Sequence, residues 1–536
     1  MQPKRFLQKE KVKMRILVSD DLAHEGIDIL KQEFDVDVKT SLSEEQLMEI
    51  IQDYDALVVR SATKVTKNII DKSNLKVIGR AGVGVDNIDV DSATRKGILV
   101  VNAPEGNTIA ASEHTVALLM AAARNIPAAV ASLKSKKWDR KSFVGVELRG
   151  KTLGVVGLGR IGKDVAYKAI GLGMNVLAYD PYVIKDHVEN IHIKVADLET
   201  VIKEADFITF HVPLTKTTYH MIDKERISMM KDKVIIINCA RGGIIDETAL
   251  YDALVSGKVA ACALDVFEHE PPLESPLIDL PNVIATPHLG ASTAEAQVNV
   301  AVDVAKDIIR ALKGEMVKNP VNMITVRPEE YNEIKPFIEL AEKMGSLYTQ
   351  LKNGRISEVE MIYTGKITRF DVKPITTAGI KGILTNILEI PANLVNAYFL
   401  AKERGIKIIE KKISKDQDAP GNVILKITTD KGVGSVSGTV FEKNEQRIIA
   451  VDDYKIDLIP KGYALMSFHR DRPGIVGEVG NLLGRNDINI AYMQLGRKSF
   501  RGEALMVLGT DEEIPENVLD EIKKIKDVSD AVFIKF

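Results

Sequence analysis

Cysteine and long hydrophobic runs are scarce in this chain, and each scarcity excludes a class of protein. The 536 residues include two cysteines, Cys239 and Cys262, and both lie in apolar strand-like stretches. We therefore expect neither a disulfide framework nor a thiolate metal site, and we assign no metal to the protein. No apolar stretch approaches the roughly 18 uninterrupted residues that a membrane-spanning helix requires, so we expect no membrane association.

An excess of charge of one sign is also missing. The chain has 72 Lys and Arg interspersed among 75 Asp and Glu, whereas nucleic-acid-binding domains concentrate positive charge. We therefore predict no nucleic-acid partner. The N-terminal stretch MQPKRFLQKEKVK is basic but has no apolar core, which argues against a signal peptide. Together with the scarce cysteines, this predicts a cytoplasmic protein.

A glycine fingerprint lies in the middle of the chain, where the strand-like run 153–156 leads into the sequence GLGRIG and then into a helical pattern. Gly157 allows the tight turn, Gly159 lets the backbone approach a pyrophosphate, and Gly162 lets the helix pack closely on the strand. Glycine-rich turns often only cap helices, but here strand, glycines, helix and second strand follow in order. This order predicts a Rossmann unit that binds a dinucleotide.

The residues around the fingerprint indicate which dinucleotide binds. The helix that starts at Arg160 offers unpaired N–H groups and the positive end of its dipole to the phosphates. Asp180, at the end of the second strand, can accept hydrogen bonds from the adenosine ribose hydroxyls. Because its carboxylate would repel a 2′-phosphate, we predict NAD rather than NADP as the cofactor.

The domain organisation follows from alternating strand-like and helical patterns, which predict parallel sheets with crossover helices. We expect a discontinuous substrate-binding domain, 14–107 plus 292–325, interrupted by an NAD-binding domain, 108–291. The stretch Thr108–Trp138 is Ala-rich and predicted helical, with a break at Pro127. With the amphipathic stretch after residue 291, it would form a hinge beside a cleft between the two domains.

The C-terminal part of the chain has a different texture. Residues 331–455 mix helical and strand-like patterns, contain no chemical motif, and are expected to form an α+β domain. Residues 459–536 read strand, helix, strand, strand, helix, strand, which is the ferredoxin-like βαββαβ order. The predicted fold class is therefore α/β, with two Rossmann-like doubly wound domains followed by these two units.

Hydride transfer also needs a group that exchanges a proton with the substrate. His288 follows a predicted strand and the turn Thr286-Pro287, Glu270 lies in the stretch DVFEHEPP, and Arg241 lies in NCARGG. All three follow strand ends of one predicted sheet, so they can converge on a substrate. The alternative is that Arg241 and Glu270 form loop salt bridges and that His288 is merely exposed; spacing alone leaves both interpretations open.

These motifs carry a family resemblance. GLGRIG with Asp180, NCARGG, DVFEHEPP and TPHLGAST occur in the order and spacing of the D-2-hydroxyacid dehydrogenase family, which this chain resembles over nearly all of 14–325. RSATKV, GRAGVGVDNID and NAPEGNT are similar to the branch that acts on 3-phosphoglycerate. The resemblance implies NAD-dependent oxidation of D-3-phosphoglycerate to 3-phosphohydroxypyruvate, the first step of L-serine biosynthesis.

The resemblance also implies individual roles. His288 would take the C2 hydroxyl proton, Glu270 would pair with His288, and Arg241 would hold the substrate carboxylate or carbonyl. The positions matching substrate contacts are Arg60, Ser61 and Asn107. Those matching the NAD site are Val83, Gly157, Gly159, Arg160, Ile161, Gly162, Asp180, Val212, Cys239, Ala240, Arg241, Asp265, His288, Leu289, Gly290 and Ala291.

A phosphorylated substrate needs additional positive charge. Arg60 and Lys64 are candidates, and the stretch Trp138-Asp139-Arg140-Lys141 could reach the site from a neighbouring subunit. The alternative for Lys64 and Lys141 is a solvated surface lysine.

The C-terminal unit resembles an ACT domain, a small module that binds amino acids, through the stretch HRDRPGIVG and the later DINI. His469, Asp471 and Asn489 match positions that contact serine in related dehydrogenases, although some relatives carry Asn at position 471. Serine is thus the expected effector; the alternative is a module that only pairs subunits. Residues 331–455 resemble the intervening domain of long-form enzymes, and we expect a homo-oligomer, either a dimer or a tetramer.

Two other functions compete with this interpretation. One is a different NAD-dependent 2-hydroxyacid dehydrogenase, of the glyoxylate or hydroxypyruvate reductase type, which usually ends where residues 331–455 begin. The other is a non-catalytic protein that senses NAD, which the ACT-like module and the lack of an interaction tail argue against.

Overall fold

The computed structural model describes residues 13–183, 192–324, 326–389, 391–413 and 419–536. The first of its four sheets has five parallel strands in the order β2-β1-β3-β4-β5. Its strands are β1 (Arg15–Val18), β2 (Asp35–Val38), β3 (Ala56–Val59), β4 (Val77–Arg80) and β5 (Leu99–Asn102). Its helices are α1 (His24–Lys31), α2 (Glu44–Ile50), α3 (Lys67–Lys72) and α4 (Val90–Lys96).

A helix from much later in the chain completes this first unit. α11 (Ala294–Lys313) packs against α1, β4 and β5. The packing is close enough to require glycine, because a Cβ at Gly79 would lie 2.6 Å from Ile308 and one at Gly26 would lie 2.8 Å from Ala301. We propose on this basis that 14–107 and 292–325 form one discontinuous domain around the segment 108–291.

The second sheet has seven parallel strands in the order β12-β11-β10-β9-β6-β7-β8. The strands are β6 (Thr152–Val156), β7 (Asn175–Tyr179), β8 (Ile193–Val195), β9 (Phe207–Phe210), β10 (Val234–Asn238), β11 (Val259–Leu264) and β12 (Val283–Ala285). The helices are α7 (Arg160–Gly171), α8 (Leu198–Glu204), α9 (Lys224–Met229) and α10 (Glu247–Val255). The strand order reverses between β6 and β9, and open parallel sheets bind ligands at such a switch point.

The Ala-rich stretch between these sheets forms two helices, α5 (Thr108–Ala123) and α6 (Ile126–Lys134). The predicted break at Pro127 is wrong, because Pro127 lies in the first turn of α6, where its missing N–H costs no hydrogen bond. The chain bends instead at Asn125, which adopts a left-handed backbone with φ of 52°. No single helix of the described residues is long and apolar enough to cross a membrane. α5 and α6 reach that length only as a pair bent by 64°, and α5 packs against α7, β10 and β11.

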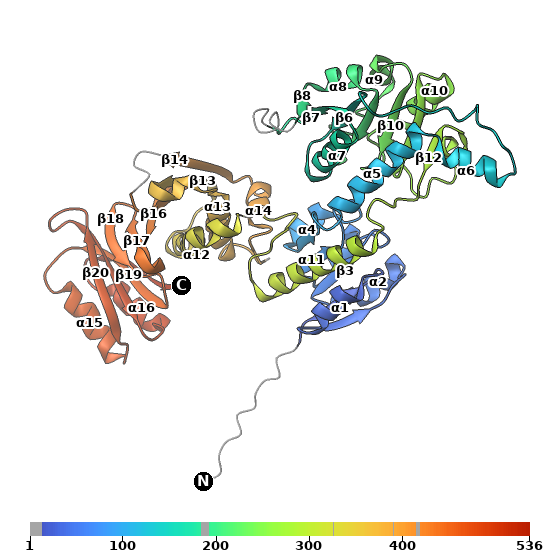
Figure 1. Ribbon diagram of the computed structural model, residues 1–536. Helices are drawn as coiled ribbons and strands as arrows, with labels where there is room; N and C mark the ends of the chain where they lie inside the picture. Colours follow the sequence, from blue (N-terminus) through green and yellow to red (C-terminus); the bar gives the residue numbers. More distant parts are fainter. Residues whose placement is uncertain (1–12, 184–191, 325, 390, 414–418) are drawn as a thin grey trace, which may run out of the picture.

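The third and fourth sheets lie in the C-terminal part of the chain, after residue 328 (Figure 1). The third has six strands in the order β14-β13-β15-β16-β17-β18, and the fourth has four in the order β20-β21-β19-β22, as in a βαββαβ unit. The third-sheet strands are β13 (Ile356–Thr364), β14 (Lys407–Ile413), β15 (Asn422–Thr429), β16 (Gly432–Val440), β17 (Gln446–Val451) and β18 (Tyr454–Leu458). The fourth has β19 (Tyr463–Arg470), β20 (Ile490–Arg497), β21 (Glu503–Thr510) and β22 (Val528–Lys535). The helices are α12 (Pro328–Leu351), α13 (Lys373–Thr385), α14 (Ala397–Glu403), α15 (Ile475–Arg485) and α16 (Glu516–Lys524).

These last two sheets share one hydrophobic core. Met344 and Leu347 of α12 belong to the same buried cluster as Met466 of β19 and Leu505 of β21. The Gln350 side chain also donates to the Lys535 carbonyl and accepts from the Lys535 N–H, both at 3.0 Å. The C-terminal unit is therefore held firmly to the intervening sheet. We propose that 331–455 and 459–536 are two domains, because each forms a separate sheet, although the two sheets share a core.

Candidate active site

The predicted dehydrogenase residues follow strand ends of the first two sheets. From the seven-stranded sheet come the glycine loop after β6, Asp180 after β7, Val212 after β9, Cys239, Ala240 and Arg241 after β10, Asp265 after β11, and His288 to Ala291 after β12. From the five-stranded sheet come Arg60 and Ser61 after β3, Val83 after β4, and Asn107 at the start of α5. Two ion pairs, Arg241–Asp86 and Arg160–Glu105, join the edges of the two sheets.

Glu270 and His288 meet directly, although they come from different loops. His288 Nδ1 lies 2.9 Å from Glu270 Oε2. An ionised carboxylate only accepts hydrogen bonds, so Nδ1 carries the proton and Nε2 is left as the basic atom of the ring. Burial raises the pKa of Glu270, but the hydrogen bond and charge of His288 outweigh it and hold that pKa below its ordinary value. The contact thus pairs an anionic carboxylate with an imidazole.

The loop that carries His288 is held by Asp265. The Asp265 carboxylate, which is fully buried, accepts from the N–H groups of Leu289 at 2.7 Å and Gly290 at 2.8 Å. Thr286 Oγ1 donates to it at 2.6 Å, and His114 Nε2 on α5 lies 3.2 Å away. Burial raises the pKa of Asp265, but these donors hold it below the ordinary value. They constrain His288 in a left-handed backbone with φ of 56°.

Asp265 therefore anchors the loop that carries His288, a role that the sequence did not reveal. The prediction placed it only beside NAD, whereas both of its oxygens are engaged by the protein. The available signal was its position one residue after an apolar strand and beside the TPHLGA turn.

Arg241 lies at the same edge but makes different contacts. Strand register aligns Asn238 with Leu264 and Leu264 with Ala285, so the three loops begin side by side. The Arg241 side chain donates through Nε to Asp86 at 3.0 Å and through Nη1 to the Ala240 carbonyl at 2.6 Å. The predicted triplet therefore consists of a bonded Glu270–His288 pair and an arginine that forms its ion pair with Asp86, which follows a strand of the first sheet.

Arg80, at the end of β4, is a cleft residue that sequence reasoning missed. Burial and then the charge of Arg241 lower its pKa to about 10, and its Nε is buried without a hydrogen-bond partner among the described residues. Its guanidinium folds back over Gly82, where a Cβ would lie 1.6 Å from Arg80 Nη1. The arginine inside the glycine cluster GRAGVGVDN was the signal that could have identified it.

Of the predicted substrate contacts, Arg60 lies close enough to Arg80 for its charge to lower the pKa of Arg80. Asp20, which is buried, accepts from the Arg60 N–H at 2.5 Å, and the Arg60 side chain donates to the Asp21 carbonyl at 3.1 Å. Ser61 is exposed. Asn107 Oδ1 and Thr108 Oγ1 are buried without hydrogen-bond partners among the described residues. Buried polar atoms normally have partners, so these atoms indicate a place where a polar ligand or water binds.

The glycine loop fits a dinucleotide. Gly157 has φ of 94°, which favours glycine, and a Cβ at Gly162 would lie 2.0 Å from the Gly157 carbonyl. A Cβ at Gly159 would meet no protein atom within 4 Å, so this glycine leaves room for a pyrophosphate to approach. Asp180 Oδ2 accepts from the Leu158 N–H at 2.8 Å and keeps free lone pairs for ribose hydroxyls.

Two other cofactor-side groups do not titrate near neutral pH. Burial lowers the pKa of His211 to about 3, and His211 Nε2 lies 3.1 Å from Thr209 Oγ1. Burial raises the pKa of Cys239 to about 12, so its thiol stays protonated. Neither residue competes with His288 as a proton acceptor.

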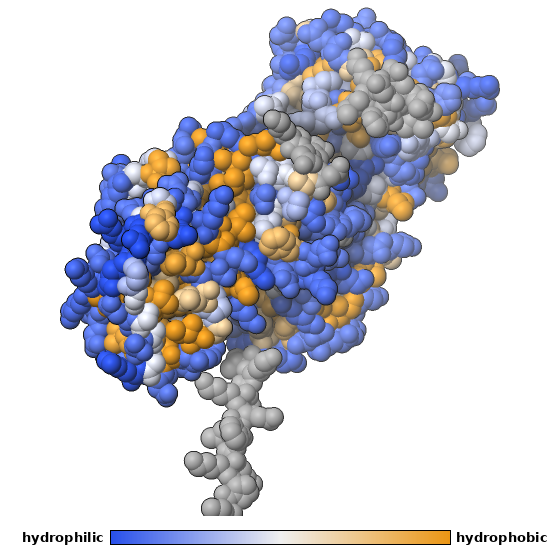
Figure 2. Space-filling view, turned by 90° about the vertical axis from the view of Figure 1, so that its left-hand side faces the viewer, coloured by the Kyte–Doolittle hydropathy of each residue, from blue (hydrophilic) through white to orange (hydrophobic). Residues whose placement is uncertain are grey.

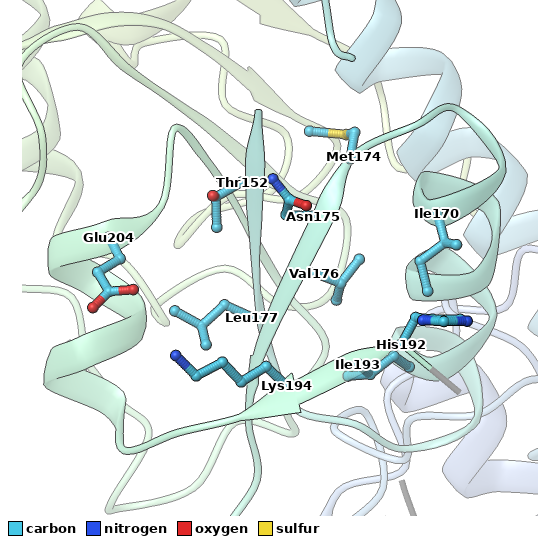
Figure 3. Close-up of a pocket in the computed structure, with 10 residues that line it drawn as sticks. All are labelled: Thr152, Ile170, Met174, Asn175, Val176, Leu177, His192, Ile193, Lys194 and Glu204. Atoms are coloured by element: carbon cyan, nitrogen blue, oxygen red, sulfur yellow. The ribbon is translucent and has the colours of Figure 1, made fainter. Parts of the chain in front are cut away.

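A pocket on the same sheet lies away from this chemistry (Figure 3). Its lining residues include Thr152, Asn175 and Ile193, the first residues of β6, β7 and β8. Ligands of open parallel sheets bind at the opposite, carboxyl ends of the strands. The pocket is therefore not the dinucleotide site.

The predicted effector residues are separated within one chain. His469 ends β19 and aligns with Ala504 of β21, whereas Asn489 precedes Ile490, which aligns with Thr510. The strand rise places these two ends of the sheet about 20 Å apart. His469 is buried, and its Nε2 has no hydrogen-bond partner among the described residues. Asp471 lies near His469 and pairs with Arg497 at 3.2 Å, while the Asn489 amide donates to Asp511 at 2.6 Å.

Three sequence-family models match successive parts of the chain. Residues 116–290 match the D-isomer specific 2-hydroxyacid dehydrogenase, NAD binding domain. Residues 333–452 match the D-3-phosphoglycerate dehydrogenase intervening domain, and residues 463–527 match the ACT domain. The predicted NAD domain, intervening domain and ACT domain are each represented.

The chain is also similar to named proteins over nearly its whole length. It is 49% identical over 523 residues to the D-3-phosphoglycerate dehydrogenase of Synechocystis, covering 97% of this chain and 94% of the relative. It is 49% identical over 525 residues to the D-3-phosphoglycerate dehydrogenase of Methanocaldococcus jannaschii, covering 97% and 99%.

Solved structures match somewhat more than half of the chain. A D-lactate dehydrogenase from Aquifex aeolicus, complexed with NAD and lactic acid, is 30% identical with a TM-score of 0.51, and the match covers 56% of this chain and 96% of that one. A glyoxylate reductase from Paecilomyes thermophila is 29% identical with a TM-score of 0.54, covering 60% and 99%.

Proposed function

The chain belongs to the D-3-phosphoglycerate dehydrogenase family, and from that premise we propose which residues carry its chemistry. It is an NAD-dependent dehydrogenase that oxidises D-3-phosphoglycerate to 3-phosphohydroxypyruvate, the first step of L-serine biosynthesis. We propose Arg241, Glu270 and His288 as the catalytic residues. The observation that carries this assignment is the 2.9 Å contact between His288 and Glu270 at the edge where the NAD fingerprint also ends.

Each of the three residues has a distinct task. When bound, NAD accepts the hydride that leaves C2 of the substrate. His288 Nε2 takes the proton of the C2 hydroxyl as the C2–H bond breaks, and Glu270 stabilises the resulting imidazolium through Nδ1. Arg241 holds the substrate carboxylate or carbonyl through charge-assisted hydrogen bonds. Its positive charge stabilises the partial negative charge on the C2 oxygen as the carbonyl forms.

Positive charge at the end of the five-stranded sheet supports recognition of the phosphate. Arg60 directly follows β3, and Arg80 is the last residue of the neighbouring strand β4. Arg80 is a partly buried cation whose buried Nε has no hydrogen-bond partner among the described residues, and a phosphate oxygen is the kind of acceptor that a guanidinium binds. We therefore add Arg80 to Arg60, Ser61, Lys64 and Asn107 as a proposed substrate contact.

The proposed substrate specificity predicts a clear order of activities. With NAD, the enzyme should oxidise D-3-phosphoglycerate with a kcat/KM at least about 100-fold above that for D-glycerate, because loss of a charged hydrogen-bonding group costs about 3 kcal/mol. The measurement is NADH formation with D-3-phosphoglycerate, D-glycerate and D-lactate. Equal activity on glycerate would favour the glyoxylate or hydroxypyruvate reductase type. The matches to the intervening and ACT domains argue against that type. NAD binding without any turnover would favour a sensing protein.

Serine is the proposed effector at the ACT domain. His469 and Asn489 lie too far apart in one chain to contact the same serine molecule. We propose that a site using both residues combines two chains, in a homodimer or a tetramer. Met493 and Leu495 of the sheet-edge strand β20 are 47% and 41% exposed, which suits a subunit contact. Figure 2 views the molecule from the left-hand side of Figure 1 and shows hydrophobic residues gathered in patches on a mainly hydrophilic surface. We also place the enzyme in the cytoplasm, as its two free cysteines suggest.

Point variants test serine regulation better than deletion of 459–536, because deletion would expose the core shared with α12. His469→Ala and Asn489→Ala should each weaken serine inhibition by at least about 10-fold, since each removes a hydrogen bond to a charged ligand. Uninhibited turnover should stay unchanged. Inhibition is measured by serine titration of the full-length enzyme, with exposed Lys523→Ala as the control. If Asn489→Ala is inhibited by serine as strongly as Lys523→Ala while His469→Ala is not, the site does not use both residues and the two-chain site is wrong.

A further inference from the structure

Asp86 reaches Arg241 from the opposite side of the cleft. Asp86 follows β4 of the five-stranded sheet, whereas Arg241 follows β10 of the seven-stranded sheet. Asp86 Oδ2 accepts from Arg241 Nε at 3.0 Å. A residue of the substrate domain thus contacts the arginine that the NAD domain contributes to catalysis.

The contacts of Arg241 leave one part of its guanidinium for a ligand. Nε is bonded to Asp86, and Nη1 donates to the Ala240 carbonyl at 2.6 Å. Nη2 lies over Gly84, where a Cβ would come within 1.8 Å of it. A guanidinium is planar and rigid, so a bond at Nε sets the direction of both terminal nitrogens. Nη2 and the second N–H of Nη1 therefore remain to hold a carboxylate.

Two neighbouring arginines, Arg241 and Arg80, favour an anion at the position of Asp86. Arg241 and Arg80 repel each other, and the repulsion contributes to the lowered pKa of Arg80. Asp86 acts on Arg80 in the opposite sense, and Asp20 and Arg60 are the other charged groups that affect it. With the Asp86 carboxylate removed, two neighbouring guanidiniums would face each other without this compensation.

A second ion pair spans the same cleft. Glu105, after β5, lies 3.4 Å from Arg160 at the start of α7, and its other oxygen pairs with Lys318 at 2.7 Å. Glu105 therefore links the substrate domain to the dinucleotide helix, as Asp86 links it to the β10 loop. Both contacts form only when the two sheet edges face each other at their present separation.

We propose that Asp86 is a positioning residue that orients Arg241 from across the cleft. The Arg241 clamp is then complete only when the two domains are closed on each other, which links closure to substrate binding. Asp86 does not touch the reacting atoms in this scheme, since it acts through the Nε of Arg241. The proposal rests on the proposed catalytic role of Arg241.

The test is a double-mutant cycle in the full-length enzyme. Asp86→Asn should lower kcat/KM for D-3-phosphoglycerate by about 10- to 100-fold, the effect of losing one charge-assisted hydrogen bond. In the Arg241→Ala background, the same substitution should cause no further loss. Asp86→Glu should recover part of the activity, and NADH binding should stay unchanged. The matched control is Asp91→Asn, which removes an exposed carboxylate of the same domain in the first turn of α4.

Each alternative outcome overturns a defined statement. If Asp86→Asn has the same kcat/KM as Asp91→Asn, Asp86 does not position Arg241. If its effect persists in the Arg241→Ala background, Asp86 acts independently of that arginine. If Arg241→Ala itself retains full activity, the catalytic assignment fails rather than the positioning role alone. The Asp86 side chain is 61% exposed, so we expect all variants to fold, which thermal unfolding checks.

Discussion

Replacing Arg241 by alanine is expected to lower kcat/KM for D-3-phosphoglycerate by about 10²- to 10⁴-fold, the effect of losing a bidentate charged clamp worth about 3–5 kcal/mol. The loss should be large because the neighbouring cation, Arg80, folds back over Gly82 on a different loop and so does not occupy the position of Arg241. NADH binding should fall by less than kcat/KM, since Arg241 is only one of the positions that match the NAD site, and the glycine loop and Asp180 lie on other loops. Steady-state kinetics and NADH fluorescence titration measure the two quantities.

Two variants make this result specific to the clamp. Arg241→Lys keeps the charge but loses the planar fork, so it should recover only part of the activity. Lys224→Ala, which removes an exposed cation from α9, should behave as the wild type. Full activity in Arg241→Ala would mean that another group holds the substrate carboxylate.

His288→Asn should reduce kcat by about 10²- to 10⁴-fold, the usual contribution of a positioned general base. Asparagine can keep a hydrogen bond to Glu270, whose 2.9 Å contact with Nδ1 holds the ring, but it cannot accept the hydroxyl proton. KM should change less than kcat, because the substrate carboxylate and phosphate are bound by arginines. Single-turnover measurement of NADH formation separates the chemical step from product release.

Glu270→Gln tests how the Glu270–His288 contact sets the pH dependence of oxidation. The pKa of Glu270 is lowered in the folded enzyme, so the ionic contact is complete above the ordinary pKa of a glutamate and is lost as pH falls through the lowered value. Glutamine removes the anion at every pH and disfavours the imidazolium. The acid limb of the pH–rate profile for oxidation should therefore move to lower pH, with a smaller loss of kcat than in His288→Asn. An unmoved acid limb would show that Glu270 does not act through His288.

Local sequence signals predicted the framework of both Rossmann-like sheets. Short apolar runs separated by amphipathic helices require parallel strands, and the fingerprint at Gly157–Gly162 specifies a turn that only glycine can form at this closeness. The ferredoxin-like order of the C-terminal unit was readable for the same reason, since each strand and helix carries its own periodicity.

Predictions that depended on distance between segments were less complete. The bend was predicted at Pro127 but occurs at Asn125. The sequence alone does not distinguish a proline in the first turn of a helix from a proline that interrupts one. The buried charge of Arg80 and the anchoring role of Asp265 depend on neighbours from other loops. The separation of His469 from Asn489 follows from strand register, which spacing along the chain does not show.

The sequence by itself determined the dinucleotide fingerprint, the order of the domains and the residue types available for hydride and proton transfer. These are properties of single segments, because backbone propensity, glycine geometry and side-chain chemistry act locally. Only the tertiary structure decided that His288 bonds to Glu270, that Asp265 holds the loop carrying His288, and that Arg241 is hydrogen-bonded to Asp86 of the first sheet. Those contacts join residues far apart in the chain, and hydrogen bonds form only where folding brings donor and acceptor within about 3 Å.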